Sequence, residues 1–154
     1  MMSADKEPLY WNAIETMSRE ELQNLQLRRL IGLLKYLEQN SAFYKNKLSS
    51  YGVCYQDIKT LDDLITLPFT SKQDIVHAAE KSAYTCGELF CGDPKEILRW
   101  HRTSGTTGKP VKIADTMEDW NRFADLSAEA IYAMGVRRED VVVVAFGYGP
   151  FIAF

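Results

Sequence analysis

The residues best suited to chemistry lie in one short stretch, TSGTTGKP, at positions 103–110. Its two glycines permit positive φ and close backbone approach, so consecutive N–H groups can turn inward and form an anion-binding concavity. The Ser and Thr hydroxyls add hydrogen-bond donors, and the lysine adds a positive charge. All of these groups suit a polyphosphate. The predicted phosphate loop consists of Thr103, Ser104, Gly105, Thr106, Thr107, Gly108 and Lys109.

This loop does not follow the Walker pattern. That pattern needs a glycine five residues before Gly108 and a Ser or Thr after the lysine, where this chain has Thr103 and Pro110. Because Pro110 disfavours a helix that starts at Lys109, the loop is predicted to join two strands and to fold over a nucleotide. The alternative is an ordinary flexible hairpin turn, since Thr, Gly and Ser are common turn residues.

Apolar periodicity and capping boxes predict a helical first half of the chain. Leucines at helical spacing follow Ser18 and Glu21, a pair that is typical of a helix N-terminus. The helices predicted in this way cover about 19–39, 42–50, 71–79 and 116–135, with one brief turn that opens at Thr60.

Strand patterns begin near residue 97. Residues 97–103 and 111–114 fit strands on either side of the loop, and VVVVAF at 141–146 reads as a fully buried strand. The order strand, helix, buried strand predicts the α/β fold class, with a helical N-terminal part followed by the start of a parallel βαβ sheet. We therefore predict two regions: 1–80, mostly helical, and 81–154, the first βαβ portion, which carries the loop.

Composition excludes several classes of protein. The formal net charge is -3 and no basic patch stands out, so we expect no nucleic-acid partner. Three cysteines are an odd number and no leader-like segment precedes Pro8, which favours a cytoplasmic protein without a disulfide framework. No apolar run approaches the roughly 20 residues needed to cross a bilayer.

Other reactive side chains give no site. The spacings of His77, Cys86, Cys91 and His101 match no zinc motif, and Cys91 has no identifiable partner for nucleophilic work. His101 alternates with Trp100 in its strand, and a packed strand histidine is favoured over one that faces a nucleotide or an acid. We therefore assign no metal ligand and no catalytic residue.

The loop sequence TSGTTGKP resembles the phosphate-binding signature of the adenylate-forming superfamily, which holds acyl-CoA ligases, luciferases and peptide-synthetase adenylation domains. The flanking stretches are similar to those of the phenylacetate-CoA ligase family: YWNAIETMSREELQNLQLRRL, FYKNKL, TLDDLITLPFTSKQD and GVRREDVVVVAFGYGPF. The resemblance runs from about Tyr10 to the last residue, and it identifies the 81–154 region with part of the superfamily's large domain.

The resemblance implies a two-step reaction. A carboxylate attacks the α-phosphorus of ATP to give an acyl-adenylate and pyrophosphate, and the thiol of coenzyme A then displaces AMP. The phosphate loop would hold the β- and γ-phosphates, with Mg²⁺ bridging phosphate oxygens. Phe146 and Phe151 would line a pocket for an aryl acid, with Tyr148 close by, although these aromatics could instead be strand-end core. Pro150 departs from the family, where an aliphatic residue is usual.

The superfamily's later elements are expected to lie beyond residue 154, which leads us to expect an N-terminal fragment of an aryl-acid CoA ligase that is inactive by itself. Two alternatives are a stand-alone nucleotide- or phosphate-binding module and a structural module that assembles without catalysis. Because the strand at 141–146 would leave a hydrophobic edge unpaired, we also expect a homo-oligomer.

Overall fold

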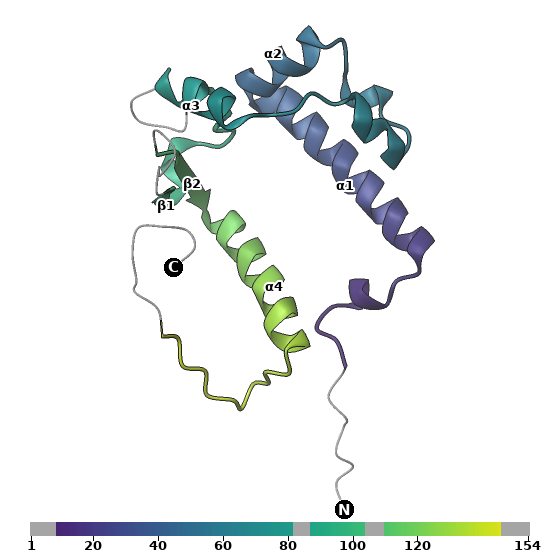
Figure 1. Ribbon diagram of the computed structural model, residues 1–154, viewed down its shortest axis with the longest axis vertical. Coiled ribbons are helices and arrows are strands. Elements are labelled where there is room, and N and C mark those ends of the chain that lie inside the picture. The colour runs from purple at the N-terminus through teal and green to yellow at the C-terminus, as the bar shows by residue number, and fades with distance from the viewer. Residues whose placement is uncertain (1–8, 82–86, 104–109, 146–154) are drawn as a thin grey trace, which may run out of the picture.

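The computed structural model describes residues 9–81, 87–103 and 110–145 (Figure 1). The helices are α1 (Arg19–Asn40), α2 (Ala42–Ser50), α3 (Lys72–Glu80) and α4 (Met117–Ala133), and the strands are β1 (Ile97–Arg102) and β2 (Lys112–Thr116). Short 3-10 turns are η1 (Ala13–Thr16), η2 (Tyr55–Asp57), η3 (Leu61–Thr66), η4 (Gly87–Leu89) and η5 (Pro94–Glu96). The helices, the turn after Thr60 and the two strands that flank the loop agree with the sequence prediction to within about two residues.

Local side-chain caps explain where the helices begin. The Ser18 hydroxyl accepts a hydrogen bond from the amide of Glu21, and the Glu21 carboxylate accepts one from the Ser18 amide, so both groups of a capping box are present. The same reciprocal motif begins α3 and α4. Such caps satisfy backbone N–H groups that have no partner within the helix. At the other end of α4, Gly135 has φ +95°, a conformation that L-residues rarely adopt, and this ends the helix where the sequence predicts.

The main core lies between the first two helices and the turns that follow them. Leu34 of α1, Leu48 of α2 and Ile58 are buried together. The partly buried side chains around them are Leu27, Leu30, Ile31, Val53, Tyr55 and Leu67. A salt bridge of 2.8 Å between Lys47 and Asp74 also ties α2 to α3.

The two strands form an antiparallel hairpin. Arg99 lies opposite Asp115, and His101 lies opposite Ile113. The prediction that the phosphate loop joins two strands is therefore confirmed, and so is the helical N-terminal part followed by a region with both strands and a helix. The division of the chain at residue 80 stays a prediction.

The predicted parallel βαβ unit is wrong within the described residues. The sheet described there has two antiparallel strands, and residues 141–145 form no strand. Val141 is 91% exposed and Val143 84% exposed, so the segment is not buried either. A buried parallel strand needs hydrogen-bonding neighbours and helices on both faces. The two described strands instead pair with each other, because a short loop joins them.

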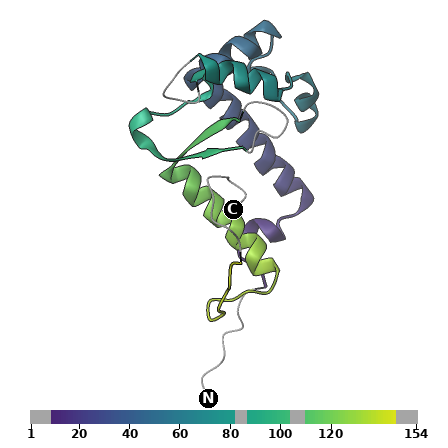
Figure 2. The ribbon, with the colours of Figure 1, turned by 60° about the vertical axis from the view of Figure 1, so that its left-hand side comes forward.

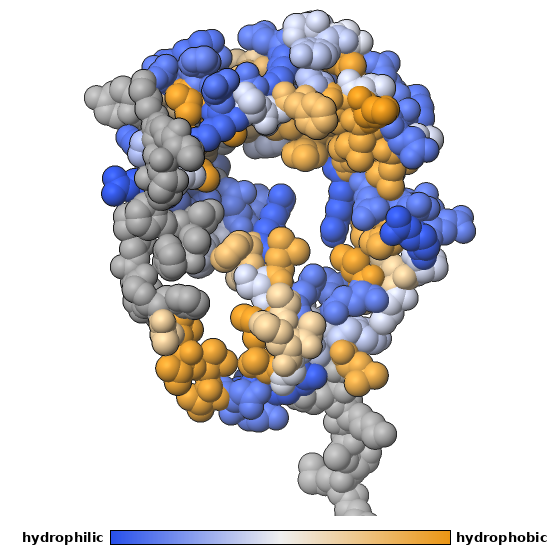
Figure 3. Space-filling model, viewed as in Figure 1, coloured by the Kyte–Doolittle hydropathy of each residue, from blue (hydrophilic) through white to orange (hydrophobic). Residues whose placement is uncertain are grey.

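Helix α4 stands apart from the core. It packs against β2, while its far end meets the N-terminal segment, where the Trp11 and Tyr132 rings lie 5.8 Å apart and Asn12 donates to Glu129 at 3.1 Å (Figures 1 and 2). No residue of α4 is buried along its described length. The space-filling view shows an opening between α1 and α4 with apolar side chains on its borders, and further apolar residues where 141–145 runs (Figure 3).

Among the helices of the described ranges, none combines the length and the apolar character that a bilayer crossing requires.

Candidate functional site

The base of the phosphate loop is closed by two hydrogen bonds between Thr103 and Val111. The Thr103 amide donates to the Val111 carbonyl at 3.0 Å, and the Val111 amide donates to the Thr103 hydroxyl oxygen, also at 3.0 Å. Val111 is only 7% exposed, so the second bond satisfies an amide that water reaches poorly. The two hydrogen bonds therefore hold Thr103 and Val111 side by side, and the loop leaves the hairpin at these two residues.

The remaining predicted site residues lie outside the described ranges. They are Ser104, Gly105, Thr106, Thr107, Gly108 and Lys109 of the loop and Phe146, Tyr148 and Phe151 of the aryl pocket. Of the predicted loop residues, Thr103 is described, and its amide and hydroxyl oxygen both serve the closure of the loop. A contact of Thr103 with phosphate stays a prediction, as do the roles of the other residues.

A cluster of charged side chains lies on the hairpin, next to the base of the loop. Along β1, the residues at odd positions are the less exposed ones, which places Arg99 and His101 on one face. Asp115 of β2 lies on the same face, and its Oδ2 is 3.5 Å from Nε of Arg99. The guanidinium carbon of Arg99 in turn lies 3.2 Å from the centroid of the Trp120 ring in the first turn of α4, a cation–π contact. The cluster therefore connects both strands to the start of the helix.

His101 is the most buried member of this cluster. Its side chain is 10% exposed, which confirms the predicted packed strand histidine. Nε2 of His101 lies against Oδ2 of Asp115 at ion-pair distance, yet no hydrogen bond to this nitrogen meets normal angular geometry.

Sequence reasoning missed Arg99, Asp115 and Trp120 as a unit. The period-two pattern of β1 could have placed Arg99 and His101 on one face. It could not reveal Asp115 as their shared partner, because that pairing depends on the hairpin register, which contains an irregularity between Ile97 and Arg99.

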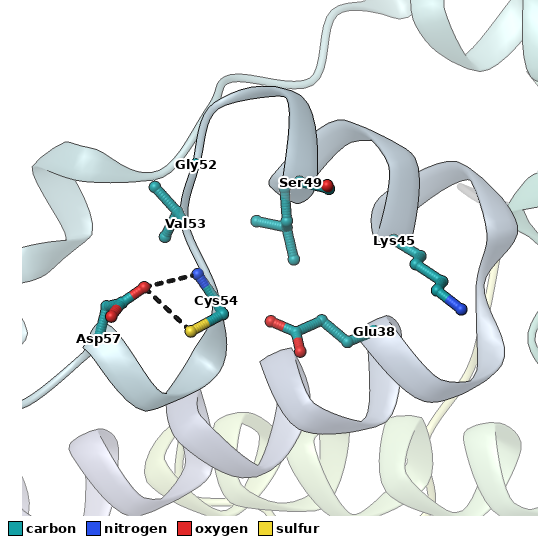
Figure 4. Close-up of a pocket in the computed structure, with 8 residues that line it drawn as sticks. Glu38, Lys45, Ser49, Gly52, Val53, Cys54 and Asp57 are labelled. Carbon is teal, nitrogen blue, oxygen red and sulfur yellow. Dashed lines mark hydrogen bonds between the residues drawn. The ribbon is translucent and has the colours of Figure 1, made fainter.

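A separate hollow of about 310 Å³ lies between α1, α2 and η2 (Figure 4). Glu38, Lys45, Cys54 and Asp57 are among its lining residues, and Figure 4 shows Lys45 on the opposite side from Asp57. Asp57 accepts hydrogen bonds from both the amide and the thiol of Cys54. The thiol bond to Asp57 raises the pKa of Cys54, which keeps the sulfur in its less nucleophilic protonated form. Thr103, the predicted site residue that lies within the described ranges, does not line this hollow.

No group of three or more His, Cys, Asp or Glu side chains within residues 9–81, 87–103 and 110–145 could hold a metal ion. Cys86, one of the residues considered for zinc, lies outside these ranges.

Some curated proteins are similar to this chain in sequence. No family model matches the sequence. It is 35% identical over 150 residues to a phenylacetate-coenzyme A ligase of Pseudomonas putida, an alignment that covers 97% of this chain. It is 37% identical over 138 residues to a phenylacetate-coenzyme A ligase of Escherichia coli K12, covering 90% of this chain. The chain is a relative of the phenylacetate-CoA ligases.

This relationship confirms the resemblance predicted from the loop and its flanks. The chain spans about a third of the length of these ligases, since the alignments cover 33% and 30% of the two proteins.

Solved structures agree with the sequence comparison. An open conformation of a 2-hydroxyisobutyryl-CoA ligase in complex with 2-HIB-AMP and CoA matches with a TM-score of 0.88 and 27% identity, over 96% of this chain and 34% of that one. The thioesterification state of this ligase, in complex with the same two compounds, matches with a TM-score of 0.80 and 29% identity over 86% of this chain and 28% of that one. The α/β fold class with a helical N-terminal part is thus shared with structures of CoA ligases.

Proposed function

We propose that this chain is the N-terminal, phosphate-binding portion of an aryl-acid CoA ligase of the phenylacetate-CoA ligase type. The observation that carries the proposal is TSGTTGKP between β1 and β2, with its base closed by Thr103 and Val111, in a chain 35% identical to a phenylacetate-coenzyme A ligase over 150 residues. The complete protein would activate a carboxylate with ATP to an acyl-adenylate and transfer the acyl group to coenzyme A.

The loop would act in the first of these steps. When the carboxylate attacks the α-phosphorus, negative charge moves onto the departing pyrophosphate, and donors that already point at it stabilise that charge without reorganisation. Ser104, Thr106 and Thr107 would supply hydroxyl donors, Gly105 and Gly108 exposed amides, and Lys109 a cation. Thr103 would fix the position of the loop through its bonds to Val111 and add a contact to phosphate.

Mg²⁺ would arrive with the triphosphate, because this ion keeps several waters and is commonly bound through substrate phosphates and one or two carboxylates. When bound, it would neutralise charge on the β- and γ-phosphates.

The acid is proposed to be aromatic. Phe146 and Phe151, with Tyr148 nearby, would provide flat apolar walls for an aryl ring. The curated relatives are phenylacetate-coenzyme A ligases, whereas the solved structures are of a ligase for 2-hydroxyisobutyrate. A coupled AMP-release assay on the longer parental protein, with phenylacetate and 2-hydroxyisobutyrate side by side, decides between them; release with neither acid contradicts the proposed reaction.

Calorimetric titration of the 154-residue chain with Mg-ATP tests the binding claim directly. We expect weak binding without turnover, because the chain corresponds to about a third of its relatives. Removing a charge-assisted hydrogen bond costs about 1.5–3 kcal/mol, so Lys109→Ala should weaken binding roughly ten- to a hundredfold. Gly108→Val should abolish Mg-ATP binding, because the added side chain would keep the phosphates away from the backbone amides. Lys95→Ala is the matched control, since Lys95 is an exposed lysine of η5.

A stand-alone module that binds nucleotide or phosphate, or that assembles without catalysis, is the second candidate. It is favoured if Mg-ATP binds but the parental protein forms no acyl-adenylate. We also propose that the chain forms a homo-oligomer, supported by the exposed valines at 141–144. A cytoplasmic location is proposed from the cysteine content alone.

A further inference from the structure

The proposed reaction gives no role to the charged cluster of Arg99, His101 and Asp115 next to the base of the phosphate loop. We propose that Asp115, through His101 and Arg99, is a positioning residue that holds the base of the phosphate loop, Thr103 and Val111, in place relative to the start of α4. This inference rests on the proposed function of the loop.

Asp115 contacts two side chains of β1 at once. Its side chain is 17% exposed, and its carboxylate lies against the imidazole of His101 and within 3.5 Å of the Arg99 guanidinium. A carboxylate at this depth is costly to bury unless such partners surround it, and loss of one partner leaves the charge uncompensated. The three side chains therefore depend on one another.

The cluster reaches the loop on one side and the helix on the other. His101 is two residues before Thr103, whose amide and hydroxyl close the loop base. Asp115 directly precedes Thr116, which caps α4 by accepting a hydrogen bond from the Asp119 amide at 3.2 Å. Arg99 completes the connection by stacking on Trp120. A tilt of the hairpin relative to α4 would separate these contacts.

His101 provides a further sign of coupling. Its Nε2 is buried and makes no hydrogen bond of normal geometry, and the group in contact with it is the Asp115 carboxylate. Asp115 of β2 thus contacts both this imidazole and the guanidinium of Arg99, which lies on the same face of β1.

Amide hydrogen exchange on the full chain tests this directly, because Thr103 and Val111 report on the loop base. We would compare wild type with His101→Gln, Asp115→Asn and the double variant, with Arg99→Lys as a milder change that keeps the charge. Asp125→Asn, at an exposed position in the middle of α4, is the matched control. Amides of α2 serve as the internal reference for the core.

We expect the protection of Thr103 and Val111 to fall about tenfold in Asp115→Asn, and the effects of the two substitutions to be less than additive, as for residues in one network. Arg99→Lys, which keeps the positive charge beside Asp115, should lower the protection less than Asp115→Asn does. Additive effects of His101→Gln and Asp115→Asn would show that the two residues do not act through each other.

Equal protection at the loop base in all variants overturns the proposal, and so does a loss that spreads equally to α2. If Asp115→Asn does not fold, His101→Gln and Arg99→Lys decide by the same readouts. Titration with Mg-ATP separates the two proposals: absence of binding by wild type defeats the binding role of the loop, while the exchange data still decide whether Asp115 positions it. If wild type binds Mg-ATP, Asp115→Asn should weaken the affinity for Mg-ATP about tenfold. An unchanged affinity contradicts the positioning role of Asp115.

Discussion

Replacing Thr103 with valine removes one of the two hydrogen bonds that close the phosphate loop and leaves the shape of the side chain almost unchanged. The Val111 amide then loses its partner at a residue that is 7% exposed. An unsatisfied buried donor costs about 1–3 kcal/mol. The added methyl group returns up to about 0.8 kcal/mol where it is covered. We therefore expect Thr103→Val to lower the free energy of unfolding by about 0.2–3 kcal/mol.

Urea unfolding and thermal melting measure this change. For a chain of this length, 1 kcal/mol corresponds to about 2–4 °C in Tm. Thr103→Ser is the matched control, because it keeps the hydroxyl oxygen that accepts from Val111. Thr103→Val should also weaken Mg-ATP binding, since a loop that is competent for part of the time binds with reduced apparent affinity. If valine and serine variants have the same stability and the same affinity, the hydrogen bond does not hold the loop and our account of its base is wrong.

Two further predictions concern α3 and the elements packed against it. The hydrogen bonds from Lys47 and Ser71 hold the pKa of Asp74 at about 2, below the usual 3.8. Because the folded-state pKa is the lower one, ionised Asp74 stabilises the fold above about pH 4, and this stabilisation is lost as the pH falls toward 2; unfolding followed across this window should be less pH-dependent in Asp74→Asn. Gly87 has φ +67°, and a Cβ there would lie 1.7 Å from the Ala78 carbonyl oxygen, so Gly87→Ala should cost about 2 kcal/mol or more. Gly52→Ala shares the φ of +67° but has open space among the described residues, and a denaturation midpoint equal to that of Gly87→Ala would contradict the role of the close approach.

The sequence predicts the local structure of this chain well because local signals decide it. Capping boxes at Ser18 and Thr116 determine where α1 and α4 begin, and Gly135 ends α4. Pro110 disfavours a helix that starts at Lys109, which favours the hairpin that the structure contains. Each of these signals lies within a few residues of the feature it controls.

The charged cluster could not be predicted in this way. Asp115 and His101 are 14 positions apart in the sequence, and they meet because the hairpin register places them diagonally across two strands. Arg99 adds a contact with Trp120 that also depends on the angle at which α4 leaves β2. Sequence reasoning could propose the loop as a site because its residues are adjacent. It missed the residues below the loop because they meet only in the folded chain.

The segment at 141–144 shows why an apolar run alone does not establish a buried strand. Its exposed fractions alternate, at 91%, 59%, 84% and 53% for Val141 to Val144, so the side chains keep the period of a strand without a partner strand among the described residues. An extended segment with unpaired backbone groups and exposed apolar side chains favours association with another chain. We expect light scattering at high concentration to detect a homo-oligomer, and Val143→Lys to shift it toward monomer. Ile65→Lys, at a β-branched residue that is 90% exposed on η3, is the matched control. A monomeric wild type, or an equal shift by both variants, would show that assembly does not use this segment.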